Sequence, residues 1–166
     1  MKVLLLFLVL ESIISCQGEA PALQTGKGIE ERSLPTFDIL LMDSITKVNT
    51  GKILGGKSIV LFFFGPNCPY CQALSKDIII HIDKFKNERI FLLSSAPFRE
   101  IKTYDTLFKL NKYPNITIGQ DYTGAFFNYF KGKGIPYLVI YDKNKNYKQT
   151  VLGRVGADSI LTIINR

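Results

Sequence analysis

Two of the three cysteines in this chain of 166 residues are separated by only two residues, in the tetrapeptide Cys68-Pro69-Tyr70-Cys71. Three cysteines are too few for a disulfide scaffold, and the small ring that this pair would close makes a poor structural clamp. Such a pair is common as a redox switch, in which a dithiol and a disulfide interconvert. It can also be half of a zinc site, so the pair by itself is compatible with either redox chemistry or zinc binding.

The residues on either side place the pair between a strand and a helix. Before it, residues 58–64 (SIVLFFF) form a continuous apolar run bounded by glycines, which predicts a strand buried on both faces. Residues 65–67 (GPN) break that strand. After the pair, apolar residues recur at helical spacing and predict a helix of about four or five turns; they are Leu74, Ile78, Ile82 and Phe85.

This placement gives the two sulfurs different chemistry. A thiol at the start of a helix faces backbone N–H groups without partners and the positive end of the helix dipole. Both favour the thiolate, so Cys68 is expected to be the attacking nucleophile. Cys71 lies one turn further in, where we expect it to be more buried and to resolve the mixed disulfide. Pro69 suits the first helical turn, and Tyr70 is expected to shape access to the sulfurs.

The zinc interpretation lacks ligands. A structural zinc site usually needs four Cys or His side chains, and the chain has a single histidine, His81. His81 follows Cys71 by ten residues on the same expected helix, about 15 Å along it at a rise of about 1.5 Å per residue. The sequence therefore predicts no metal and no cofactor other than a redox-active disulfide between Cys68 and Cys71.

The other elements alternate between strands and helices. Strands are expected near residues 36–41, 46–49, 90–95, 115–119, 137–141 and 147–152. Helices are expected near residues 98–110 and 124–131, and from about residue 158 to the end. Strand–helix alternation followed by a hairpin and a helix predicts an α/β fold with a mixed sheet.

The composition is that of one ordinary globular domain, with 46% hydrophobic and 21% charged residues. The net charge of +7 raises the question of an anionic partner. The lysines are scattered, however, and no run of five or more like charges occurs. With no nucleic-acid-binding motif present either, we expect no nucleic-acid partner.

The N-terminus predicts export. Lys2, the apolar run 3–10 and the small residues that follow describe a signal peptide over residues 1–15, too short for a bilayer span of about 20 apolar residues. Residues 13–16 (IISC) resemble a bacterial lipobox, which would make Cys16 the lipidated first residue of the mature chain. Glu11 departs from that pattern, and a plain signal peptide with an incidental Cys16 is the alternative. Residues 16–33 then form a polar tether and residues 34–166 the folded domain.

Three segments together resemble the thioredoxin superfamily, and most of all its exported TlpA/ResA-like branch of membrane-tethered thiol–disulfide oxidoreductases. They are residues 56–64 (GKSIVLFFF), 68–71 (CPYC) and 134–142 (GIPYLVIYD). The resemblance extends from about Leu34 to the C-terminus. It implies a thioredoxin-like fold whose mixed central sheet is flanked by helices, with a strand–helix insertion inside residues 90–132.

The resemblance also assigns substrate contacts. It implies a cis peptide bond between Ile135 and Pro136 facing the cysteine pair, with Ile135 offering backbone hydrogen bonds to an extended substrate segment. From the sequence alone, Pro136 could equally be an ordinary trans proline that opens a strand. We therefore expect Pro69, Tyr70, Ile135 and Pro136 to contact the substrate.

Three positions depart from the family pattern. Asn67 stands where thioredoxins carry a tryptophan, and Phe62 where cytoplasmic thioredoxin carries a buried aspartate. Leu74 stands where some ResA-like proteins carry a glutamate. The sequence thus identifies no base that would deprotonate Cys71, and water is left as the proton acceptor.

The expected function is thiol–disulfide exchange with protein thiols and disulfides on the periplasmic side of a bacterial envelope, anchored through Cys16. Family analogy favours a disulfide reductase fed by a membrane redox donor. A peroxiredoxin-like thiol peroxidase would need a hydroxyl donor where the chain has Gly65. An SCO-like copper-binding protein would space its cysteines by three residues and add a distal histidine, which the position of His81 disfavours. A redox-inert adaptor would have no use for the cysteines.

Overall fold

The structure is a computed structural model that describes residues 33–166. The predicted signal peptide, the lipidation of Cys16 and nearly all of the predicted tether lie outside the described residues. Within residues 33–166, no helix combines the length and apolar character needed to cross a membrane.

One seven-stranded mixed sheet forms the centre of the fold, with the strand order β2-β1-β5-β4-β3-β6-β7. Strands β3, β4 and β5 are parallel, whereas β6 is antiparallel to both β3 and β7, and β1 is antiparallel to β2 and β5. The strands are β1 (Asp38–Leu41), β2 (Lys47–Asn49), β3 (Ile59–Phe63), β4 (Arg89–Ser94), β5 (Ile116–Gln120), β6 (Tyr137–Tyr141) and β7 (Tyr147–Leu152).

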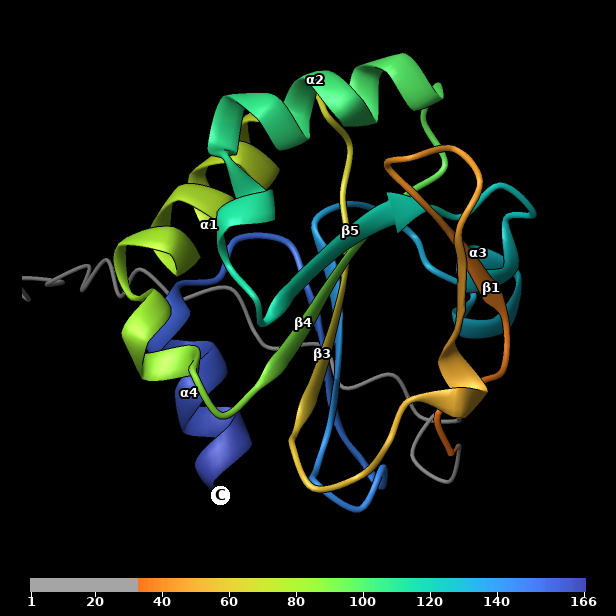
Figure 1. Ribbon diagram of the computed structural model, residues 1–166. Helices are drawn as coiled ribbons and strands as arrows, with labels where there is room; N and C mark the ends of the chain where they lie inside the picture. The colour runs from red at the N-terminus through yellow and green to blue at the C-terminus, as the bar shows by residue number, and fades with distance from the viewer. Residues whose placement is uncertain (1–32) are drawn as a thin grey trace, which may run out of the picture.

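Helices cover both faces of this sheet (Figure 1). They are α1 (Pro69–Ile80), α2 (Phe98–Phe108), α3 (Ala125–Phe130) and α4 (Ala157–Asn165), with short 3₁₀ segments η1 (Thr50–Lys52), η2 (Ile82–Phe85) and η3 (Leu110–Lys112). Apolar residues of α1, α2 and α4 share one core cluster, and those of α3 belong to a second cluster. The predicted α/β fold is confirmed, and the strand–helix insertion expected inside residues 90–132 corresponds to β5 followed by α3.

The central strand β3 is apolar at every position because it is covered on both faces of the sheet. All five of its residues are buried. Val60 and Phe62 enter the cluster with α1, α2 and α4, while Leu61 and Phe63 enter the cluster with α3. Because alternate side chains of a strand point to opposite faces, a strand covered on both faces must be apolar at every position. β3 therefore holds the residues that follow it at a fixed point between two cores.

The helix after the cysteine pair is shorter than predicted. α1 ends at Ile80, His81 leaves the helical conformation at φ −104° and ψ 19°, and the chain continues as η2. Ile82 and Phe85 still pack on the same core cluster as α1. A 3₁₀ segment has about three residues per turn, so it keeps residues i and i+3 on one face and extends the apolar spacing without extending the α-helix.

Candidate redox site

Cys68 is the N-cap residue of α1, directly beyond the end of β3. Its backbone is extended, at φ −81° and ψ 116°, and its sulfur accepts a hydrogen bond from the backbone N–H of Cys71 at 3.3 Å. Pro69 occupies the first turn, where its missing N–H leaves no helical hydrogen bond unmade. Cys68 is half-buried, and both cysteines are free thiols in this structure. The predicted placement of the pair at the strand–helix junction is confirmed.

Cys71 is fully buried in the core cluster beneath Cys68. Burial is the main cause that raises the pKa of the Cys71 thiol to about 12, and the hydrogen bond between the Cys71 and Cys68 side chains adds to it. A hydrogen bond from the backbone of Gly65 acts in the opposite direction. The two sulfurs thus differ in exposure and in protonation. Cys68 is partly open to solvent, whereas Cys71 is buried beside it as a protonated thiol.

A buried pair of hydroxyls fixes the backbone of Cys71. The hydroxyl of Tyr104 on α2 donates to the carbonyl oxygen of Cys71 at 3.0 Å and lies 2.7 Å from the hydroxyl of Ser75. Burial raises the pKa of Tyr104 well above its usual value, so this phenol stays protonated. Tyr104 therefore ties the first turns of α1 to α2 at the backbone of Cys71.

Strand pairing carries Ile135 and Pro136 to the cysteines. β3 and β6 are antiparallel with Phe63 opposite Tyr137, so the residues before β6 lie beside the residues after β3. The Ile135–Pro136 peptide bond is cis, as the family resemblance implies. A Cβ placed on Gly65 would lie 2.6 Å from Cδ1 of Ile135 and 3.6 Å from Cβ of Cys68. Gly65 is thus the contact point between this loop and the cysteine pair.

A family model for thioredoxin-like proteins matches residues 55–147, which is more than half of the chain. The chain belongs to the thioredoxin-like family. Its fold is shared by solved disulfide oxidoreductases, and it carries the Cys68–Cys71 dithiol at the start of α1.

An uncharacterized protein of Haemophilus influenzae is 28% identical over 127 residues, which cover 74% of this chain and 81% of that protein. A secreted Mycobacterium tuberculosis disulfide oxidoreductase, described as homologous to DsbE of E. coli, has the same fold. Its TM-score is 0.65 at 17% identity, over 78% of this chain and 94% of that one. Peroxidoxin BcpB of M. tuberculosis is similar in fold as well, with a TM-score of 0.67 at 13% identity, over 82% and 96%.

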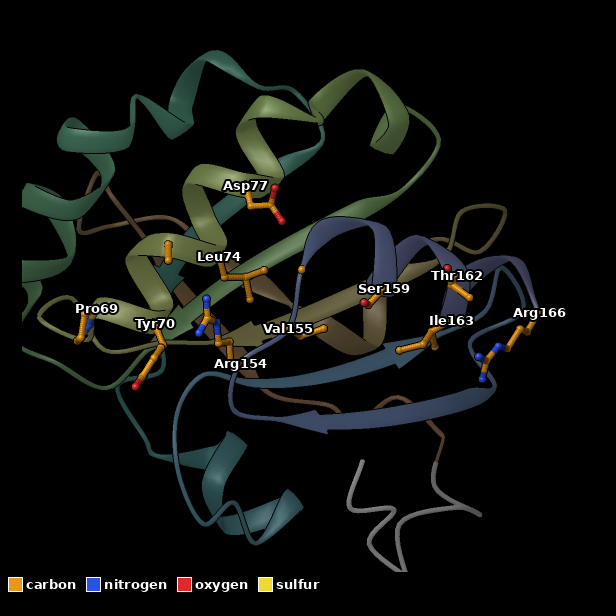
Figure 2. A pocket seen from close by; sticks show the side chains of 12 residues that line it. Pro69, Tyr70, Leu74, Asp77, Arg154, Val155, Ser159, Thr162, Ile163 and Arg166 are labelled. Carbon is orange, nitrogen blue, oxygen red and sulfur yellow. The ribbon is translucent and has the colours of Figure 1, made fainter. Parts of the chain in front are cut away.

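A groove of about 820 Å³ runs between α1 and α4 and begins at Pro69 and Tyr70. Figure 2 shows Tyr70 and Leu74 of α1 on one side of it and Val155 and Ile163 on the other. Tyr70 is 56% exposed, and Ile135 is 37% exposed. The thioredoxin-like site therefore presents apolar surface next to Cys68.

The positions where relatives carry an acid are filled by buried apolar side chains. Phe62 and Leu74 both belong to the core cluster that surrounds Cys71. A carboxylate at either position would need a partner in that cluster, because an isolated buried charge is costly. The polar side chains next to the Cys71 backbone are instead the hydroxyls of Tyr104 and Ser75.

His81 lies at the opposite end of α1 from the cysteines. Its Nδ1 is 3.1 Å from a carboxylate oxygen of Asp77 and 3.0 Å from the Asp77 carbonyl oxygen. This position keeps His81 from completing a metal site with Cys68 and Cys71. Within residues 33–166, no cluster of three or more His, Cys, Asp or Glu side chains is arranged to hold a metal ion.

The sequence did not reveal Tyr104, Ser75 or the contact of Gly65 with Ile135. A signal for the first two exists, since each places a hydroxyl on the apolar face of its helix, where a buried polar group needs a partner. Their pairing across 29 residues has no local signature. The contact at Gly65 depends on the register of β3 and β6, which only the assembled sheet defines.

Proposed function

We propose that this thioredoxin-like protein is an extracytoplasmic disulfide reductase that acts on proteins of a bacterial envelope through Cys68 and Cys71. The observation that carries the proposal is the contrast between the two sulfurs. Cys68 is half-buried at the N-cap of α1, while Cys71 is buried directly behind it as a protonated thiol. In such a pair, the half-buried thiol of Cys68 can attack a substrate disulfide, and the buried thiol of Cys71 can then resolve the mixed disulfide.

The reaction balances as an exchange of two electrons. The Cys68 thiolate attacks one sulfur of a substrate disulfide, forms a mixed disulfide and releases the first substrate thiolate. Cys71 then loses its proton to solvent and attacks the sulfur of Cys68, which releases the second substrate thiol and leaves the Cys68–Cys71 disulfide. A donor dithiol, in our proposal one held in the membrane, reduces that disulfide by the same steps in reverse.

The substrate segment is proposed to lie across the half-exposed surface beside Cys68. Tyr70 and Ile135 offer apolar contact on either side, since Ile135 touches Gly65 and Tyr70 forms the rim of the groove. Pro69 also lines the groove, and Pro136 holds Ile135 at this edge because its carbonyl accepts a hydrogen bond from the Gly153 N–H at 2.9 Å. An extended segment could then bond to the backbone at Ile135, as strand addition requires.

Location and direction rest on the sequence. The predicted signal peptide and Cys16 support an anchored protein outside the cytoplasm. The fold likeness to a secreted M. tuberculosis oxidoreductase agrees with that location. The TlpA/ResA-like resemblance supports the reductive direction, because those relatives mostly reduce disulfides.

The deciding measurement is the reduction potential of the Cys68–Cys71 pair in residues 17–166. The protein is equilibrated at defined ratios of reduced to oxidised dithiothreitol, and alkylation with mass spectrometry then measures the fraction of the pair that is reduced. We expect a two-electron transition near or below that of thioredoxin, about −270 mV. A value near about −120 mV would instead identify an oxidase that installs disulfides. Cys68→Ser is the control that forms no internal disulfide.

The peroxidase alternative has the fold but not the site. The position three residues before Cys68 is Gly65, which supplies no hydroxyl, and a Cβ there would lie 2.6 Å from Cδ1 of Ile135, so Ile135 would have to shift. We therefore expect hydrogen peroxide consumption in the presence of dithiothreitol to stay at the level of the Cys68→Ser control. Consumption clearly above that control would favour the peroxidase.

A further inference from the structure

Three loops meet at the end of the sheet opposite the cysteine pair, and we call residues 52–58, 86–89 and 142–146 the basic pole. The backbone N–H of Gly56 donates to the carbonyl of Lys143 at 2.8 Å. The side chain of Lys57 donates to the carbonyl of Lys86 at 3.1 Å. β3 begins at this pole and ends at the cysteines, so the two surfaces lie at opposite ends of one strand (Figure 1).

The basic pole concentrates positive charge that the sequence shows only as scattered lysines. Its cations number six against two acids, a net charge of +4 out of the chain's +7: Lys52, Lys57, Lys86, Arg89, Lys143 and Lys145 against Glu88 and Asp142. The Asp142 carboxylate accepts hydrogen bonds from the backbone N–H groups of Asn144 and Asn146, within its own exposed turn. With six cations against two acids, the surface of the pole is cationic on balance.

An apolar side chain stands among these cations. Leu54 is 76% exposed, and the guanidinium of Arg89 donates to its carbonyl oxygen, which holds the two residues together. Leu54 lines one shallow groove of about 410 Å³ together with the cations Lys57, Lys86 and Arg89 and one acid, Glu88. An exposed leucine beside several cations matches the lipid interface, where an apolar side chain enters the acyl boundary and cations meet phosphates.

The chain also enters the domain beside this pole. The hydroxyl of Thr50 donates to the carbonyl oxygen of Pro35 at 2.5 Å, and a Cβ on Gly51 would lie 2.6 Å from the hydroxyl oxygen of Thr36. Residues 35–36 therefore lie against η1, immediately before the pole (Figure 1). If Cys16 anchors the chain, the end of the domain that carries the basic pole is the end joined to the membrane by the tether.

We infer that the basic pole docks on a membrane surface rich in anionic phospholipid and so holds Cys68 on the side away from the bilayer. The occupant is a lipid surface rather than an acidic protein because an exposed leucine, a ring of cations and the point of chain entry coincide. This inference goes beyond the proposed redox function, and no thiol takes part in the binding. Only its argument from the point of chain entry rests on the anchor proposed at Cys16; the charge and the exposed leucine do not.

Residues 33–166 contain the whole sheet and both cores and lack Cys16, so this fragment tests the pole without the predicted anchor. The measurement is co-sedimentation with phosphatidylcholine vesicles that contain either no anionic lipid or about one-third phosphatidylglycerol. We expect binding to the anionic vesicles alone, and weaker binding as salt rises from about 0.05 to 0.3 M, which shortens the screening length.

Two double variants with equal change in net charge separate the pole from the overall charge. Lys86→Glu with Lys143→Glu reverses two exposed cations of the pole, whereas Lys76→Glu with Lys102→Glu reverses two exposed cations on α1 and α2. We expect the first to weaken binding at least about tenfold, since each cation near an anionic surface contributes substantially. The second should keep most of the binding. Leu54→Ser should weaken binding without changing the charge.

Each other outcome overturns the inference. Equal losses in the two double variants would mean that net charge and not the pole governs binding. No binding to either kind of vesicle would exclude the membrane and leave an acidic protein surface as the occupant. Equal binding to both kinds would mean that apolar contact and not the cations governs membrane binding. Thermal unfolding followed by circular dichroism confirms that every variant is folded before it is scored.

Discussion

In the proposed exchange, Cys71 must lose its proton before it can resolve a mixed disulfide, and its burial predicts that this is the slow step. With a pKa of about 12, only about one Cys71 in 100,000 is a thiolate at neutral pH. The contributions from Cys68 to this raised pKa disappear once Cys68 is bonded to the substrate, whereas burial remains. We therefore expect the pKa of Cys71 in the mixed disulfide to stay above its ordinary value of 9.0.

Reaction of the reduced protein with dithionitrobenzoate separates the two steps. The first release of thionitrobenzoate reports the attack by Cys68, and the second reports resolution by Cys71. The rate of the second release should rise about tenfold per pH unit, and thus about a hundredfold from about pH 7 to pH 9, because only the thiolate attacks. The absorbance of the released thionitrobenzoate measures both phases in a stopped-flow instrument.

Two variants check the assignment of the phases. Cys71→Ala should keep the first phase and lose the second, while Cys68→Ser should lose the fast first phase. A second phase that reaches a plateau below about pH 9 would refute the reasoning, since it would show that Cys71 ionises as readily as an ordinary thiol or that a base assists it.

Three further predictions follow from the same contacts. Tyr104→Phe should lower the free energy of unfolding by about 1–2 kcal/mol in urea titrations because it removes buried hydrogen bonds, whereas Tyr122→Phe at an exposed site should change it by less than about 0.5 kcal/mol. Gly65→Ala should cost about 1 kcal/mol or less, because the terminal Cδ1 of the partly exposed Ile135 can move away from the new Cβ. That cost should shrink in an Ile135→Val background, which lacks the Cδ1 atom that the new Cβ would meet; an unchanged cost would place Ile135 away from Gly65. Finally, the reduced protein should lose stability as pH rises from about 9 toward 12, by up to about 1.4 kcal/mol per unit, because the unfolded Cys71 ionises there while the folded one keeps its proton. Cys71→Ala should lack this component in alkaline urea titrations, and an identical slope in the two proteins would assign the loss to other groups.

The elements of this fold were largely predictable because their signals are local. The strand after Ser58 is apolar at every position, and β6 and β7 have the predicted bounds. The end of α1 was not predictable from apolar spacing, because η2 keeps Ile82 and Phe85 on the same face. Periodicity reports which face is buried and does not distinguish an α-helix from a 3₁₀ segment that continues it.

By itself, the sequence determined that a dithiol stands at the start of a helix behind a buried strand. It also predicts which cysteine attacks first, since a helix N-terminus acts on the nearest side chain. The family resemblance added the cis bond before Pro136. Only the tertiary structure decided the burial of Cys71, its hydroxyl support from Tyr104, the contact of Ile135 with Gly65 and the gathering of the basic pole. These features join residues far apart in the chain, and their energies depend on solvent exclusion and strand register, which exist only once the sheet has formed.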